Sequence, residues 1–257
     1  MKLSEIYELV DGVAPFSLSR EYCEKYGTYD NSGILLDCGE EIKGILFSLD
    51  CSMAAVQKAK ALGANLIITH HPAIYAPLKG LRAENPVTAC AKAGISILSA
   101  HLNLDCAKGG IDERMAQALG AGKTVKMHTL SLGGYGSVFP VEKTKFAAFV
   151  EEARAKFRTK NVLFFGEKES DVKKVASFCG AGLDEESVAF AVEEGADTIV
   201  SSDPKHHVIA QAVERGLNVL ILTHYAAENY GFHQFYQKIK EKCSLVPMEY
   251  FEDGRLM

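Results

Sequence analysis

The sequence predicts an α/β protein made of two pseudo-symmetric lobes with mixed, mostly parallel sheets. Three observations support this fold class: short apolar runs, helical patterns that alternate with them, and an internal repeat. The chain has 257 residues, which is enough for one large α/β domain or for two closely packed halves.

Five short runs rich in Ile, Leu and Val predict the strands of the sheets. Their apolar character is continuous rather than alternating, which is typical of strands buried on both faces in parallel sheets. The runs are ILFSLD (45–50), LIIT (66–69), ISILSA (95–100), TIVS (198–201) and NVLILT (218–223).

Helical patterns lie between these runs and end in glycine, a residue that commonly terminates helices. Strands that alternate with such helices indicate βαβ units. The helical segments are MAAVQKAKALG (53–63), VTACAKAG (87–94) and HHVIAQAVERG (206–216).

The chain also repeats itself. Residues 56–72 align with residues 188–204 without a gap, and residues 93–105 resemble residues 215–228 with one extra residue in the second copy. Both matches occur in the same order, which chance alone would rarely give. We therefore expect two related halves, each helix–strand–helix–strand, that face each other about a pseudo-twofold axis.

The segment between the copies differs from both of them. Residues 123–180 read as strand, helix, strand and strand, which suggests a small α/β insert carried on the main sheet. The expected organisation is a first lobe at 1–122, the insert at 123–180 and a second lobe at 181–257, with the two lobes forming one integrated fold. Glycines at 133, 134, 136, 180 and 182 could form phosphate-binding nests, but tight turns and close packing are the more common use.

Composition excludes several classes of protein. The net charge of −5 disfavours general electrostatic binding of nucleic acid. No apolar run approaches the roughly 20 residues of a membrane helix. The N-terminal segment has acidic residues within its apolar stretch and reads as an amphipathic helix rather than a secretory signal. Seven scattered cysteines without a C-x-x-C pair indicate a reducing compartment, so we expect a cytoplasmic protein.

Histidines follow the predicted strands at the points where the strands end. His70 and His71 follow LIIT, His101 follows ISILSA, His224 follows NVLILT, and His206 and His207 come shortly after TIVS. Ligand sites in open α/β sheets lie outside the carboxyl ends of the strands. The sequence therefore predicts that these histidines gather at sheet edges.

The spacing of carboxylates strengthens this prediction. His101 and Asp105 are four residues apart, and so are His224 and Glu228. Residues at i and i+4 of a helical turn lie on one face, so each copy of the repeat directs an imidazole and a carboxylate to one point. Pro72 keeps His71 extended, so His70 and His71 could reach different ions.

Imidazole and carboxylate ligands without thiolate suit zinc, iron, manganese or cobalt. Three histidines and two acids are many for one catalytic zinc and about right for two divalent ions per subunit. The ligands expected are His70, His71, Asp105, His224 and Glu228. Two such ions less two carboxylates leave a charge of about +2, which favours an anionic substrate. The alternative is that the histidines only pack and cap, in an enzyme whose active site lies elsewhere in the chain.

At these residues the chain resembles the Nif-three-like dinuclear-metal-centre family, whose members are also named homologues of GTP cyclohydrolase I type two. The resemblance covers nearly the whole chain. Its motifs are NSGILLDCG (31–39), FSLD (47–50), ITHHPAIY (68–75), AHLNLD (100–105), CGAG (179–182), GADTIVSSDPKHH (195–207) and THYAAEN (223–229). One departure is Ser202 before Asp203, where the family often has glycine.

The resemblance implies a two-lobed fold with the metals in a cleft between the lobes, and a ring-shaped homohexamer. It implies the same five metal ligands, with Glu228 as the bridging carboxylate. Asp50, Asp203, Lys205 and His207 would line the cleft. His101 and His207 are the candidates for catalytic proton transfer.

Two functions remain open from the sequence. The first is a metal-dependent hydrolase that acts on an anionic nucleotide or phosphoester, with ring opening of GTP as the variant that the family name suggests. The second is a non-catalytic hexamer that stores or delivers metal or binds a partner. Aromatic residues near the motifs are expected to pack in the core rather than bind a ligand: Tyr75, Tyr225, Tyr230 and Phe232.

Overall fold

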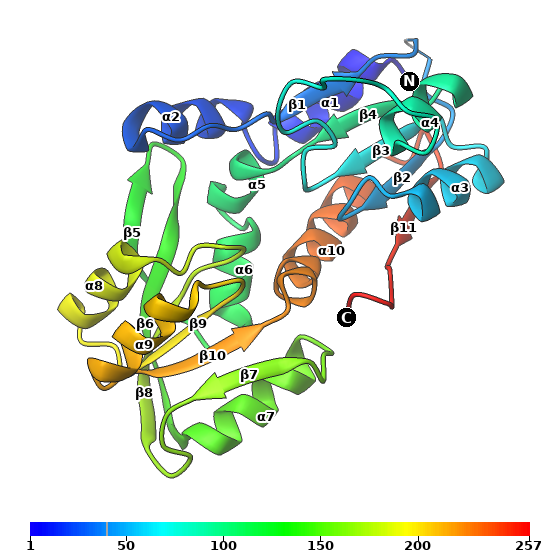
Figure 1. Cartoon of the computed structure of the whole chain (residues 1–257). Coiled ribbons are helices and arrows are strands. Elements are labelled where there is room, and N and C mark those ends of the chain that lie inside the picture. Colours follow the sequence, from blue (N-terminus) through cyan, green and yellow to red (C-terminus); the bar gives the residue numbers. More distant parts are fainter. Residues whose placement is uncertain (40) are drawn as a thin grey trace. The chain divides into compact units, whose positions relative to one another are not determined.

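The computed structural model describes residues 1–39 and 41–257, which form two compact units of mixed α/β structure (Figure 1). Unit 1 contains residues 1–107 and 232–252, and unit 2 contains residues 108–231 and 253–257. The predicted fold class is confirmed, since each unit contains a mixed sheet with helices. Among the described residues, no helix combines the length and the apolar character that crossing a bilayer requires.

Unit 1 contains a five-stranded sheet in the order β1-β4-β3-β2-β11. Strands β4, β3, β2 and β11 run parallel, and β1 pairs with β4 in the antiparallel direction. The strands are β1 (Gly33–Leu36), β2 (Ile45–Ser48), β3 (Leu66–Thr69), β4 (Ser96–Ser99) and β11 (Met248–Phe251). The helices are α1 (Leu3–Asp11), α2 (Phe16–Tyr26), α3 (Met53–Leu62), α4 (Pro86–Ala93) and α5 (Leu102–Cys106).

Strands β2, β3 and β4 are buried along their whole length, as their continuous apolar runs predicted. On one face, Ile67 and Ile97 pack in a cluster with residues of α3 and α4. Phe47 contacts the aromatic rings of Phe232 and Tyr236, which belong to helix α10 (His224–Lys242). These two apolar layers fix the sheet, and with it the loops that leave its carboxyl edge.

Unit 2 contains a six-stranded sheet in the order β5-β6-β8-β9-β10-β7. Its strands are β5 (Val125–Leu130), β6 (Gly133–Lys145), β7 (Val162–Phe165), β8 (Asp171–Ser177), β9 (Thr198–Ser201) and β10 (Asn218–Leu222). Its helices are α6 (Ile111–Ala118), α7 (Phe146–Lys156), α8 (Glu185–Glu193), α9 (His206–Glu214) and the first part of α10 (His224–Lys242). Helix α10 begins in unit 2 and its residues from 232 onward belong to unit 1.

The internal repeat is visible in the topology of each unit. Strands β2, β3 and β4 with helices α3, α4 and α5 follow the same order as β8, β9 and β10 with α8, α9 and α10. The pairing of Leu66 with Ser96 corresponds to that of Thr198 with Asn218. An antiparallel strand flanks the third strand of each copy, β1 beside β4 and β7 beside β10. Two copies of one supersecondary unit therefore underlie the chain.

The segment 123–180 is part of the second sheet. It supplies β5, β6, β7 and β8, and β8 pairs in parallel with β9. The compact units divide the chain at 107/108, 231/232 and 252/253, whereas the sequence suggested divisions at 122/123 and 180/181. The long strand β6 accounts for the difference, because its pairing with β5 and β8 ties the middle segment to strands of the second copy.

Candidate metal centre

In unit 1, the predicted histidines lie at the carboxyl edge of two adjacent parallel strands. His70 and His71 directly follow β3, and His101 follows β4 and precedes α5. Asp105 lies one helical turn further along, inside α5. The predicted gathering at this edge is confirmed for these four residues, because β3 and β4 pair in parallel and end together.

His70 is fully buried, and its ring is fixed by the neighbouring strand. Its Nδ1 atom lies 2.8 Å from the carbonyl oxygen of Ala100. A carbonyl only accepts hydrogen bonds, so Nδ1 carries the proton and Nε2 presents its lone pair. That Nε2 lies 3.5 Å from Oδ1 of Asp105, itself buried. Two electron-donating atoms at this separation can share a cation.

His71 is held in the same way by a carboxylate. Its Nδ1 atom lies 2.7 Å from Oδ1 of Asp50, the residue that follows β2 by two positions. The carboxylate fixes the tautomer and the ring orientation and makes Nε2 a better donor to a metal. His71 and Asp50 are both partly exposed, so the pair lies at the rim of this group.

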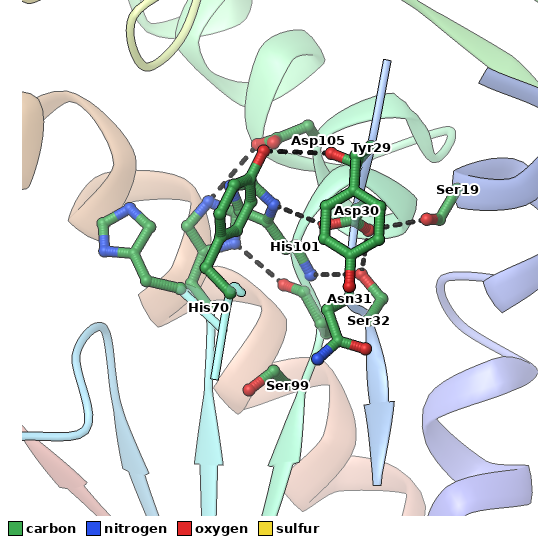
Figure 2. A network of polar contacts seen from close by, with 12 residues as sticks. Ser19, Tyr29, Asp30, Asn31, Ser32, His70, Ser99, His101 and Asp105 are labelled. Carbon is green, nitrogen blue, oxygen red and sulfur yellow. Dashed lines mark hydrogen bonds and ion pairs between the residues drawn. The ribbon is translucent and has the colours of Figure 1, made fainter. Parts of the chain in front are cut away.

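The side chain of His101 is held by a hydrogen-bond network that is centred on Asp30 (Figure 2). Nδ1 of His101 donates to Oδ1 of Asp30 at 2.8 Å. The other oxygen of Asp30 accepts hydrogen bonds from the hydroxyls of Ser19 at 2.6 Å and Ser32 at 2.5 Å. The backbone N–H of His101 donates to the Ser32 hydroxyl at 3.1 Å. The carboxylate is therefore buried with three donors.

This network lowers the pKa of Asp30 and raises the pKa of His101. Burial alone would raise the pKa of Asp30, but hydrogen bonds from His101, Ser19 and Ser32 and the charge of His101 hold it far below its usual range. Burial alone would lower the pKa of His101, but the hydrogen bond to Asp30 and the charges of Asp105 and Asp30 raise it above its ordinary value. The pair therefore favours an imidazolium beside a carboxylate.

In unit 2, His224 and Glu228 lie at the start of α10, directly after β10. Nε2 of His224 is 3.0 Å from Oε2 of Glu228, as the four-residue spacing predicted. Nδ1 of His224 is 2.7 Å from Oδ2 of Asp203, which has a left-handed backbone with φ of 48°. Strained residues of this kind persist where the surrounding structure holds them, and they cluster at functional sites.

Gly180 makes room for this second group. A Cβ atom at this position would lie 2.7 Å from Oε1 of Glu228 and 3.5 Å from Nε2 of His224, and the backbone φ is 60°. Only glycine fits both requirements. Close packing, expected for this glycine, is thus confirmed.

The donor set of unit 1 fits a divalent metal, and in unit 2 His224 and Glu228 are two donors of the same kind. In each of the four histidines, Nδ1 faces an oxygen acceptor, so Nε2 is the ring nitrogen suited to coordinate a metal. The ligand atoms of His70, His101 and Asp105 all lie within 4.8 Å of one another, which places His101 in the same donor group. Oxygen and nitrogen donors of this kind suit first-row divalent ions.

Other predicted residues lie elsewhere. His207 is exposed at the start of α9, where its Nε2 is 2.8 Å from Oε1 of Glu185.

Tyr225 and Phe232 are buried, which confirms their predicted packing, but Tyr75 is 50% exposed, so a core role for it was wrong. Sequence reasoning missed Asp30, because it lies 71 positions before His101 and outside any regular spacing.

The chain matches a protein-family model described as Duf34/NIF3 (NGG1p interacting factor 3) over residues 1–252. A protein of Clostridium perfringens named GTP cyclohydrolase 1 type 2 homolog is 30% identical over 253 residues, covering 94% of this chain and 92% of that protein. A protein of the same name from Methanocaldococcus jannaschii is 30% identical over 250 residues, covering 95% and 97%.

Solved structures agree with these matches. A Bacillus cereus protein related to NIF3 superimposes with a TM-score of 0.85 at 21% identity, covering 98% of this chain and 97% of that one. HcgD from Methanocaldococcus jannaschii, in a structure described as reduced, gives a TM-score of 0.83 at 28% identity and covers 98% of both chains.

Fold and site together define a mixed α/β protein with a repeated strand–helix unit and histidine–carboxylate groups suited to metal. The chain belongs to the DUF34/NIF3 family.

Proposed function

We propose that the two histidine–carboxylate groups bind two divalent metal ions per chain. The ligands would be His70, His71 and Asp105 from unit 1 and His224 and Glu228 from unit 2. The support is the orientation of the rings. An oxygen acceptor holds Nδ1 of each of the three histidines, and Nε2 of His70 and His224 points toward the carboxylates of Asp105 and Glu228. Such outer partners typically change metal affinity by about 10–100-fold.

We further propose that the chain is a hydrolase for an anionic substrate such as a nucleotide or a phosphoester. Divalent ions held by these ligands would withdraw charge from the attacked group and make water nucleophilic near neutral pH. Two ions less the charges of Asp105 and Glu228 leave about +2, which attracts an anion. GTP is the first substrate to test, because the name of the curated relatives refers to it.

The observation that favours catalysis over storage is the pair of His101 and Asp30. Asp30 accepts a hydrogen bond from Nδ1 of His101, so Nε2 is the atom that can give or receive a proton. A storage site needs ligands but no oriented proton carrier next to them. His101 lies beside Asp105 and His70, and its charged form is stabilised by the carboxylates around it. His207, paired with Glu185, is left out of this role.

The alternative is a metal-carrying or partner-binding protein, and both roles would suit the homohexamer that we propose by family resemblance. The test loads the full chain with zinc, manganese, iron or cobalt. Hydrolysis of GTP and of a panel of phosphoesters is then followed by product chromatography, before and after chelation. We expect the loaded chain to hydrolyse GTP or one of the phosphoesters. Chelation should abolish this turnover, and added metal should restore it. Bound metal without turnover of any compound would favour the carrier role. Light scattering gives the mass of the assembly.

A further inference from the structure

Two exposed aromatic rings lie beside the His101 group. Tyr29, between α2 and β1, is 53% exposed, and Tyr75, in the segment after β3, is 50% exposed. Large side chains that are singly exposed are common on protein surfaces. These two are in contact with each other, because their ring centroids lie 5.6 Å apart and the ring planes meet at 86°.

Hydrogen bonds between the two segments hold the rings in place. The Tyr75 hydroxyl donates to the carbonyl oxygen of Tyr29 at 3.0 Å, and the side-chain amide of Asn31 donates to the carbonyl oxygen of Ile74 at 2.6 Å. A ligand that stacks on rings already fixed in this way loses little affinity to ordering them. The pair is therefore a prepared surface rather than a pair of mobile side chains.

The aromatic pair and the His101 group are parts of one local structure. Tyr29, Asp30 and Asn31 follow one another along the chain, and the Asp30 carboxylate bonds to His101 (Figure 2). The Tyr75 ring is 6.3 Å from the His101 ring, at 89° to it. A ring that stacks on Tyr75 would thus lie next to the candidate proton carrier.

We propose that Tyr29 and Tyr75 form a stacking subsite for a planar aromatic ring of the substrate, whose anionic group binds at the metal ligands. The anionic part of this inference rests on the proposed function, whereas the ring part rests on the two tyrosines. Stacking on tyrosine accepts any ring with a π face, so the subsite selects aromatic over ring-free substrates and does not read one base.

The experiment compares two ligands that share a phosphate and a ribose and differ in the ring: GMP and ribose 5-phosphate. Binding to the manganese-loaded full chain is measured by titration calorimetry for the wild type, Tyr29→Leu and Tyr75→Leu. Leucine keeps apolar bulk at a half-exposed position and removes the aromatic ring. At position 75 it also removes the hydroxyl that donates to the Tyr29 carbonyl, so Tyr29→Leu is the cleaner test of stacking. Leu245→Ala is the control, since Leu245 is a large apolar residue of unit 1 that is 80% exposed.

GMP should bind at least about tenfold more tightly than ribose 5-phosphate, which is the effect of one stacked ring. Each tyrosine variant should lose most of this preference for GMP and leave the affinity for ribose 5-phosphate unchanged. The subsite is overturned if the wild type binds the two ligands equally well, or if both variants keep the preference for GMP. Metal content is measured on the same samples: a wild type without metal sinks the proposed function, whichever way the ring comparison falls.

Discussion

Oδ1 of Asp30 lies 2.8 Å from Nδ1 of His101, although the two residues are 71 positions apart in the sequence. The contact joins the segment before β1 to the end of β4, the two strands that pair in the antiparallel direction. This charged hydrogen bond lies next to His70 and Asp105, but neither Asp30 nor His101 is among the expected metal ligands. Several predictions about stability and activity depend on this pair and on its counterparts at the other histidines.

Replacing Asp30 with asparagine should lower stability in a pH-dependent way. Asp30 has a depressed pKa, so its contribution is present above its ordinary value of 3.8 and is lost as pH falls through the folded value. His101 has a raised pKa, so its contribution is complete below 6.5 and is lost as pH rises through the folded value. Both contributions to stability are present between pH 3.8 and pH 6.5.

Urea unfolding of chelator-treated protein measures this effect. The wild type should exceed Asp30→Asn by about 2 kcal/mol in free energy of unfolding near pH 5, as for a hydrogen bond between charged groups. The difference should shrink near pH 9. A difference that stays constant from pH 5 to pH 9 would show that the pair is not ionised as described.

His101→Gln separates proton transfer from metal binding. Glutamine can still bond to Asp30 but cannot carry a proton near neutral pH, so turnover should fall by about 10²–10⁴-fold while two metals remain bound. His207→Gln is the matched control, because His207 pairs with Glu185 on the surface and should not affect turnover. Loss of one metal in His101→Gln would instead make His101 a ligand, consistent with its closeness to His70 and Asp105.

Gly180→Ala should weaken metal binding, because the new Cβ atom would displace the Glu228 carboxylate. Gly195→Ala is its control: φ is 68° there, against 60° at Gly180, but no atom lies within 4 Å of the added Cβ. Both variants should lose about 1 kcal/mol of stability from the left-handed backbone. Only Gly180→Ala should lose affinity in a competition titration against a coloured chelator, and equal losses would refute the role assigned to Gly180.

Asp203→Asn tests the outer partner of His224. Asparagine tolerates the left-handed backbone, so the fold should survive, but the loss of the charge should lower metal affinity by about tenfold or more. Glu185→Gln removes the carboxylate beside the exposed His207 and should leave metal affinity unchanged. Calorimetric titration of both variants with manganese makes the comparison, and similar affinities would rule out support of His224 by Asp203.

Much of the fold could be predicted because its signals are local or repeated. The apolar runs became β2, β3, β4, β9 and β10, and the aligned copies became two units with matching strand order and register. The four-residue spacing of His224 and Glu228 became a contact because the helix that starts there is local. The amphipathic N-terminus became α1.

Other features depend on long-range pairing, which spacing does not encode. The length of β6 and its pairing with both β5 and β8 bound the middle segment to the second sheet. The partnership of Asp30 and His101 arises where the strand after Asp30 lies beside the strand before His101. Tyr75 is half exposed, and its hydroxyl bonds to the carbonyl oxygen of Tyr29, which lies 46 positions earlier in the chain.

Metal content of the full chain decides whether the histidine–carboxylate groups hold two ions. The protein is stripped with chelator, reloaded with manganese, freed of excess metal and analysed by plasma mass spectrometry, in parallel with Asp105→Asn and Glu228→Gln. Two ions per chain are expected in the wild type and fewer in each variant, with unchanged circular dichroism. A wild type that holds no metal, or variants that both retain two ions, would contradict this expectation.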